Sequence, residues 1–167
     1  MEQNTQTPMN EPESFKSGMI HFVLSHSYMA FLGAVILGVI FDVFIPIKIF
    51  NMAVYQYGGL GMLLLGSLLI YWAQSTSHSS KKEAGGSGSE RDFERGPYKY
   101  SRNPTHIGLS VLTLGLAFLL NSPFSILFTV FASILSKFFF LKEEEALLEK
   151  KYGQPYRDYK NKVRTWV

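Results

Sequence analysis

The stretch "PTHIGLSVLTLGLAFLLNSPFSILFTVFASILSKFFFL", residues 104–141, decides the fold of this 167-residue chain. It holds two apolar runs, 104–120 and 123–141, which are separated only by Asn121 and Ser122. A helix needs about 20 apolar residues to cross the hydrocarbon core of a bilayer, so each run can form a membrane helix. Pro123 suits the first position of a helix, where its missing N–H costs no hydrogen bond. The stretch therefore predicts a tight hairpin of two membrane helices.

Two more apolar runs precede this hairpin, at residues 28–45 and 54–72. Buried helices of soluble proteins often have apolar runs of only 10–14 residues, and all four runs here are longer. Charged residues make up 17% of the chain, against about 25% in a typical soluble domain. The sequence thus predicts an all-α integral membrane protein with about four transmembrane helices, whose principal partner is the lipid bilayer.

The remaining polar sequence lies before, between and after these runs. Residues 1–13 are polar and acidic and predict a disordered tail, which leaves 14–167 as a single membrane-embedded domain. Within that domain, residues 14–27 favour an amphipathic helix in the membrane interface, with Phe15 and Phe22 on its apolar face.

Two longer polar segments flank the hairpin. Residues 74–103 predict a polar loop, in which "GGSGS" at 85–89 is flexible by composition and is either native or an engineered insertion. Residues 142–167 predict a helical segment, interrupted where Gly153 and Pro155 end the first helix.

The distribution of basic residues predicts the orientation in the membrane. Lysine and arginine concentrate in the loop 74–103 and in the segment 142–167, whereas Lys48 is the one basic residue in the two opposite connections. Cytosolic loops carry the excess of such residues, so both termini and the long loop are expected to be cytosolic. The net charge of +3 does not indicate a nucleic-acid partner, and the absence of cysteine excludes disulfides and thiolate metal sites.

The loop ends in the unusual stretch "RGPYKYSRNPTHIG", residues 95–108. Asn103 is a good helix N-cap and Pro104 a good first helical residue, so this motif can simply begin the third membrane helix. Tyr98 can equally lie in the aromatic belt of the interface, and Arg102 can contact lipid phosphates.

An acidic run, Glu143 to Glu145, follows the fourth apolar run and is either a solvated turn or part of a ligand site. A carboxylate can accept two ribose hydroxyls or attract a sulfonium, and a helix N-terminus beside arginine and asparagine attracts a carboxylate. Aromatic rings can enclose a flat base or a cation. These chemistries together fit S-adenosylmethionine, although complementarity of this kind is not specific.

Residues 95–164 resemble the membrane-embedded isoprenylcysteine carboxyl methyltransferases and their bacterial relatives, a group that includes phospholipid N-methyltransferases. The resemblance is carried by "GPYKYSRNPTHIG" and, after about 35 residues, by "EEALLEKKYGQPYRDYKNKV". The matching residues are Gly96, Pro97, Tyr98, Arg102, Pro104, Gly108, Glu144, Glu145, Leu148, Gly153, Tyr156, Tyr159 and Val163. The first two apolar runs match only as membrane helices.

Three positions depart from the family pattern. Tyr152 replaces a phenylalanine, Asn103 replaces the usual histidine, and His106 replaces the usual tyrosine. Asparagine can cap a helix and form a hydrogen bond to a cofactor, but it cannot act as a base. The role of His106, in packing or in proton transfer, stays open.

The resemblance implies methyl transfer from S-adenosyl-L-methionine to a membrane-associated amphiphilic acceptor, with a prenylcysteine-type carboxylate as the leading candidate. It implies a cytosolic cofactor pocket that the C-terminal segment closes, and no metal. The implied catalytic residues are Arg102 and His106, and the implied cofactor-binding residues are Tyr98, Arg102, Asn103, Pro104, His106, Glu144 and Glu145. The alternatives are a lipid amine or small-thiol methyltransferase and a non-catalytic membrane scaffold of the same fold.

Overall fold

The computed structural model describes residues 13–47, 53–83 and 95–165, which form helices and no strands. The elements are α1 (Glu13–Phe44), α2 (Ala53–Glu83), the short 3-10 helix η2 (Gly96–Lys99), α3 (Pro104–Leu119), α4 (Pro123–Phe138), α5 (Phe140–Tyr152) and α6 (Gln154–Lys162). The glycine-serine segment 85–89 and all but the last residue of the predicted tail lie outside the described residues.

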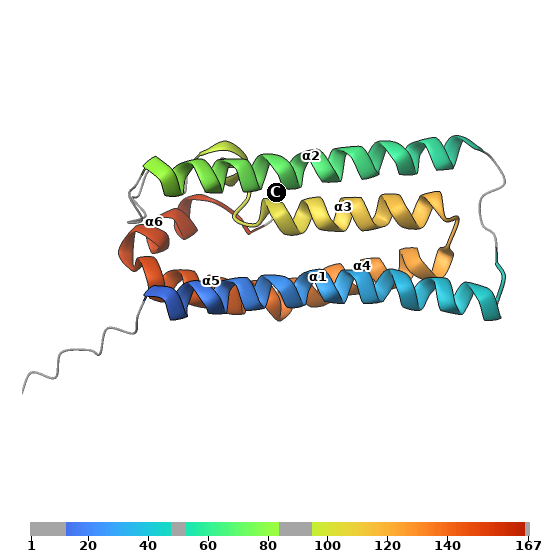
Figure 1. Ribbon diagram of the computed structural model, residues 1–167, viewed down its shortest axis with the longest axis horizontal. Helices are drawn as coiled ribbons and strands as arrows, with labels where there is room; N and C mark the ends of the chain where they lie inside the picture. Colours follow the sequence, from blue (N-terminus) through green and yellow to red (C-terminus); the bar gives the residue numbers. More distant parts are fainter. Residues whose placement is uncertain (1–12, 48–52, 84–94, 166–167) are drawn as a thin grey trace, which may run out of the picture.

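The helices form an elongated bundle made of two pairs (Figure 1). Helix α2 packs along α3, and α1 packs along α4 and α5. A seam of polar contacts lies between the pairs, where the Ser133 hydroxyl of α4 donates to the Ser110 hydroxyl of α3 at 3.1 Å. Helix α6 lies at the end of the bundle where α3 begins (Figure 1), and this end also holds the C-terminal end of α2.

Three helical segments are long and apolar enough to cross a membrane by length and composition: Ser25–Phe44, Tyr55–Ser77 and Pro123–Lys150. Their outward side chains include large apolar residues with high exposure, such as Leu65 at 65% and Phe131 at 58%, as expected for surfaces that contact lipid. Helix α3 is apolar but has only 16 residues, which span about 24 Å. The structure thus supports three of the predicted spans, and the fourth, 104–120, stays a prediction.

The bounds of several predicted segments differ from those in the structure. The expected interfacial segment 14–27 is the first part of the continuous helix α1, and no break separates it from the apolar run. Helix α2 continues to Glu83, so the polar loop begins later than residue 74, where it was predicted to begin. The helix continues because no glycine or proline occurs between residue 74 and Gly85 to end it. The loop also contains η2.

The α3–α4 connection is the tight hairpin that the sequence predicts. Asn121 takes a left-handed backbone conformation with a φ of 50°, which asparagine tolerates better than most residues. The Ser122 hydroxyl then accepts a hydrogen bond from the Ser125 backbone N–H at 3.0 Å and caps α4, while Pro123 occupies the first turn.

The contact between α2 and α3 depends on glycines. A Cβ atom on Gly66 would lie 2.6 Å from the Leu112 nitrogen and 2.7 Å from the Gly108 carbonyl oxygen. A Cβ on Gly115 would likewise lie 2.6 Å from the Leu63 nitrogen. The two backbones therefore touch directly, which is how small residues allow close packing between membrane helices.

This packing predicts a sharp difference between two glycines of α2. Gly66→Ala should lower the free energy of unfolding by about 1–3 kcal/mol, since the added methyl group meets backbone atoms that cannot move aside. Gly61→Ala is the matched control, because a Cβ there meets nothing within 4 Å and alanine favours the helix by about 1 kcal/mol. Thermal unfolding of both variants in the same detergent measures the difference. Equal midpoints would contradict the close α2–α3 contact.

Candidate active site

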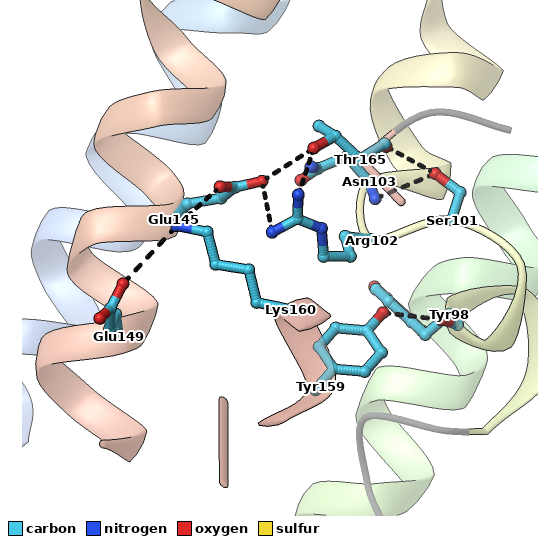
Figure 2. A network of polar contacts seen from close by, with 9 residues as sticks. All are labelled: Tyr98, Ser101, Arg102, Asn103, Glu145, Glu149, Tyr159, Lys160 and Thr165. Atoms are coloured by element: carbon cyan, nitrogen blue, oxygen red, sulfur yellow. Dashed lines mark hydrogen bonds and ion pairs between the residues drawn. The ribbon is translucent and has the colours of Figure 1, made fainter. Parts of the chain in front are cut away.

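A buried ion pair joins the start of α3 to α5. Arg102 Nη1 lies 3.1 Å from Glu145 Oε1, and the two side chains are only 9% and 12% exposed. Thr165 completes the contact, because its hydroxyl accepts a hydrogen bond from Arg102 Nη2 and donates one to Glu145 Oε1 at 3.3 Å (Figure 2). Both charges are thus removed from water but remain paired, the condition under which buried charges are tolerated.

The residues that follow α6 are fastened to the segment before α3. The Arg102 backbone N–H donates to the Arg164 carbonyl at 3.1 Å, and the Ser101 hydroxyl donates to the Thr165 carbonyl at 2.9 Å. The Tyr159 hydroxyl donates to the Tyr98 carbonyl at 2.6 Å (Figure 2). These contacts confirm that the two polar segments recognised in the sequence meet at one end of the bundle.

Glu145 also contacts a second cation. Lys160 Nζ lies 3.4 Å from Glu145 Oε2 and 3.6 Å from Glu149 Oε2, so it bridges α6 and α5 (Figure 2). Glu149 further pairs with the exposed Arg157 at 2.7 Å, a contact that adds little stability because water screens it. The carboxylate of Glu145 is therefore fully compensated within the protein.

The adjacent carboxylate, Glu144, has a different environment. Its Oε2 lies 3.8 Å from His106 Nδ1, a contact that is an ion pair only when the imidazole is protonated. The same oxygen is buried and has no hydrogen-bond partner among the described residues. His106 itself is 2% exposed, and its Nε2 lies 3.1 Å from the Ser27 hydroxyl of α1, which fixes the orientation of the ring.

Tyr98 lies within the electrostatic reach of Glu144. Burial raises the pKa of the Tyr98 phenol, and the negative charge of Glu144 raises this pKa further, although the phenol's hydrogen bond to Thr105 partly offsets the increase. The phenol therefore stays neutral at physiological pH and keeps a proton that it can donate.

Asn103 and Pro104 begin α3 as predicted, but the asparagine side chain makes no capping hydrogen bond. Asn103 is 5% exposed, and its Nδ2 is buried without a hydrogen-bond partner in the described part of the chain. Arg102 Nε is also buried and has no hydrogen-bond partner among the described residues. Buried polar atoms are normally satisfied, so two donors and one carboxylate oxygen without partners in one region indicate a place for a ligand.

The structure thus brings Arg102 to Glu145 and His106 to Glu144, with Tyr98 within the electrostatic reach of Glu144. The other two residues that the resemblance implied, Asn103 and Pro104, follow Arg102 at the start of α3. Sequence reasoning missed Ser27, Lys160 and Thr165. Ser27 is 79 positions from His106, and no local pattern marks such a distant contact. Within the described residues, no group of three His, Asp or Glu side chains is arranged to hold a metal ion.

The family model described as "Phospholipid methyltransferase" matches residues 54–155, which is more than half of the chain. The match includes the first polar motif and the second motif as far as Pro155. This chain belongs to the phospholipid methyltransferase family. Membership in this family explains why the two motifs of this chain have the same order as in the family pattern, one before and one after a helical hairpin.

Two curated proteins are similar to this family member, and both are named protein-S-isoprenylcysteine O-methyltransferase. The one from Schizosaccharomyces pombe is 34% identical over 68% of this chain and 50% of its own length. The one from Saccharomyces cerevisiae is 32% identical over 82% of this chain and 61% of its own length. The chain therefore spans about half to three fifths of these relatives. No solved structure gives a significant match.

The different environments of the adjacent glutamates predict opposite effects on stability. Glu145→Gln should destabilise the protein by about 2 kcal/mol, because Arg102 and Lys160 lose their common negative partner. Glu144→Gln should leave the thermal midpoint unchanged or raise it, since it removes a buried charge whose oxygen has no hydrogen-bond partner. Each variant is the control for the other in thermal unfolding. Equal losses would show that the two carboxylates share one environment.

Proposed function

We propose that this chain is an integral membrane methyltransferase that transfers a methyl group from S-adenosylmethionine to an amphiphilic acceptor, a prenylcysteine-type carboxylate. Family membership and the names of the two similar proteins support this proposal. The observation that carries it is the buried carboxylate of Glu144, held beside His106 and Tyr98 with an oxygen that makes no hydrogen bond in the described residues.

The unsatisfied atoms of the site fit the chemistry of S-adenosylmethionine. Glu144 offers a negative acceptor, which suits ribose hydroxyls or a positively charged group. Asn103 Nδ2 and Arg102 Nε offer donors at the start of α3, which suit a carboxylate. When bound, the cofactor supplies the methyl group on a sulfonium that leaves as a neutral sulfide.

The residues at the start of α3 favour a carboxylate acceptor. An anionic oxygen needs no base before it accepts a methyl group, and Asn103 cannot supply one. An amine would first have to lose a proton, a task that would fall to His106 or Glu144. We propose that Arg102 orients the acceptor or the cofactor, while Glu145 and Thr165 hold its guanidinium in place. Positioning and exclusion of water then supply most of the rate increase.

The proposed site lies at the end of the bundle that we assign to the cytosol. The basic residues of 95–102 and 142–165 cluster there, as the positive-inside rule requires for the cytosolic side of a membrane protein. With α3 as a fourth crossing, both chain ends lie in the cytosol, and the acceptor's apolar chain can remain within the bilayer.

Cofactor binding by Glu144→Gln tests the site assignment. The variant should keep its thermal midpoint but bind S-adenosylmethionine at least tenfold more weakly, since a charge-assisted hydrogen bond contributes about 1.5–3 kcal/mol. Calorimetry on detergent-purified protein measures this affinity. Glu143→Gln is the matched control, because Glu143 is exposed on the same helix turn. Wild-type affinity in Glu144→Gln would remove Glu144 from the site.

The acceptor is tested with labelled S-adenosylmethionine and two amphiphiles in the same detergent. A farnesylcysteine derivative should become a base-labile methyl ester, and phosphatidylethanolamine should remain unlabelled. The reverse result would favour the lipid amine acceptor. Cofactor binding without methylation of either compound would contradict the proposed acceptor but not the cofactor site.

Single cysteines test the orientation and the crossing by α3. Lys99→Cys should react with a membrane-impermeant thiol reagent only from the cytosolic side, and Leu120→Cys and Ile47→Cys only from the opposite side. All three side chains are exposed, and the chain has no other cysteine. Reaction of Lys99→Cys and Leu120→Cys from the same side would show that α3 does not cross.

A further inference from the structure

A broad cavity of about 540 Å³ lies beside the proposed active site and has a strongly basic lining. Its lining residues are Arg102, Lys137, Lys160, Asn161, Lys162, Val163, Arg164 and Thr165. Five of these eight residues carry a positive charge, and none is acidic. The cavity brings together the end of α4, the end of α6 and the residues that follow α6.

The charge of this lining does not suit S-adenosylmethionine. That molecule carries one carboxylate against one ammonium and one sulfonium, so it is a net cation at neutral pH. A wall of lysine and arginine repels such a ligand, whereas a phosphate group is attracted to it. Arg102 and Lys160 also contact Glu145, so the other cations of the lining are Lys137, Lys162 and Arg164.

The position of the cavity indicates the source of the phosphate. Lys137 is in the last turn of α4, within a segment that is long and apolar enough to cross a membrane. Phe138 and Phe139 follow it and are 55% and 63% exposed, as aromatic residues at a membrane boundary are. The cavity therefore lies at the level where an apolar helix ends and lipid headgroups begin.

We propose that this cavity binds the phosphate of an anionic phospholipid headgroup, as a site separate from the methyl acceptor. Basic pockets beside membrane helices on the cytosolic side are suited to such headgroups. Arg102 belongs to the cavity lining and stays paired with Glu145, so the proposal assigns the phosphate to the lysines of the lining. The proposal concerns lipid binding and does not depend on the identity of the methyl acceptor.

The test measures the affinity of the detergent-purified full chain for fluorescent phosphatidylglycerol and for phosphatidylcholine with the same acyl chains. Phosphatidylglycerol should bind at least tenfold more tightly. The double variant Lys137→Gln/Lys162→Gln should weaken phosphatidylglycerol binding by about 30-fold, as expected for the loss of two charges near a membrane surface. The control, Lys99→Gln/Lys142→Gln, removes two exposed charges that do not line the cavity and should bind as the wild type does.

Inorganic phosphate distinguishes a lipid site from a site for soluble phosphate. Millimolar phosphate should displace bound phosphatidylglycerol only weakly, since the acyl chains add affinity that free phosphate lacks. Displacement at concentrations comparable to those of the lipid would overturn the lipid assignment. Equal binding of the two lipids, or equal losses in the cavity and control variants, would overturn the site itself.

A second measurement applies if the cavity variant does not fold. Raising potassium chloride from 50 to 500 mM should weaken phosphatidylglycerol binding to the wild type and leave phosphatidylcholine binding unchanged, because salt screens the attraction between exposed charges. Insensitivity of phosphatidylglycerol binding to salt would contradict a basic phosphate site.

Discussion

The contact between Arg102 and Glu145 is the constraint on which the end of the bundle that holds α6 depends. It joins the start of α3 to α5, and Thr165 brings in the residues after α6. Neither charge can be left alone, because a buried guanidinium or carboxylate without its partner is strongly destabilising. The requirement to satisfy both charges therefore fixes how the C-terminal segment folds back over the start of α3. It also fixes where the neighbouring Glu144 must lie.

Two consecutive glutamates consequently have different properties. Glu145 has two cationic contacts and a hydroxyl donor, and it serves the structure. Glu144 is one position earlier on the helix, lies 3.8 Å from the buried imidazole of His106 and is within electrostatic reach of the Tyr98 phenol. Protein interiors seldom keep a carboxylate oxygen without a donor, so its retention here is best explained by a ligand that supplies the donor. Position on the helix thus separates a carboxylate that is paired within the protein from one whose Oε2 has no hydrogen-bond partner among the described residues.

Much of the fold could be predicted from the sequence, because its determinants are local. Pro123 with Ser122 marks the hairpin, and Gly153, with a φ of 66°, ends α5. The gathering of the two motifs was predicted from their expected placement on one side of the membrane. The sequence could not distinguish Glu144 from Glu145, since their difference comes from Lys160 and Thr165, contacts made through tertiary structure. It also could not pair Ser27 with His106, because α1 lies far away in the chain.

The seam between the two helix pairs has a mechanical consequence. Within the α2–α3 pair the backbones touch at glycines, and the contact leaves no space for even a methyl group. Between the pairs, Ser110 meets Ser133 and His106 meets Ser27 through single hydrogen bonds. Such bonds average about 0.6 kcal/mol in membranes, because the same groups also find hydrogen-bond partners in the unfolded state. Away from the Arg102–Glu145 ion pair, which fastens the two pairs at one end, the pairs are therefore held to each other less firmly than α2 is held to α3, and any relative movement of the pairs is expected to be largest at the opposite end.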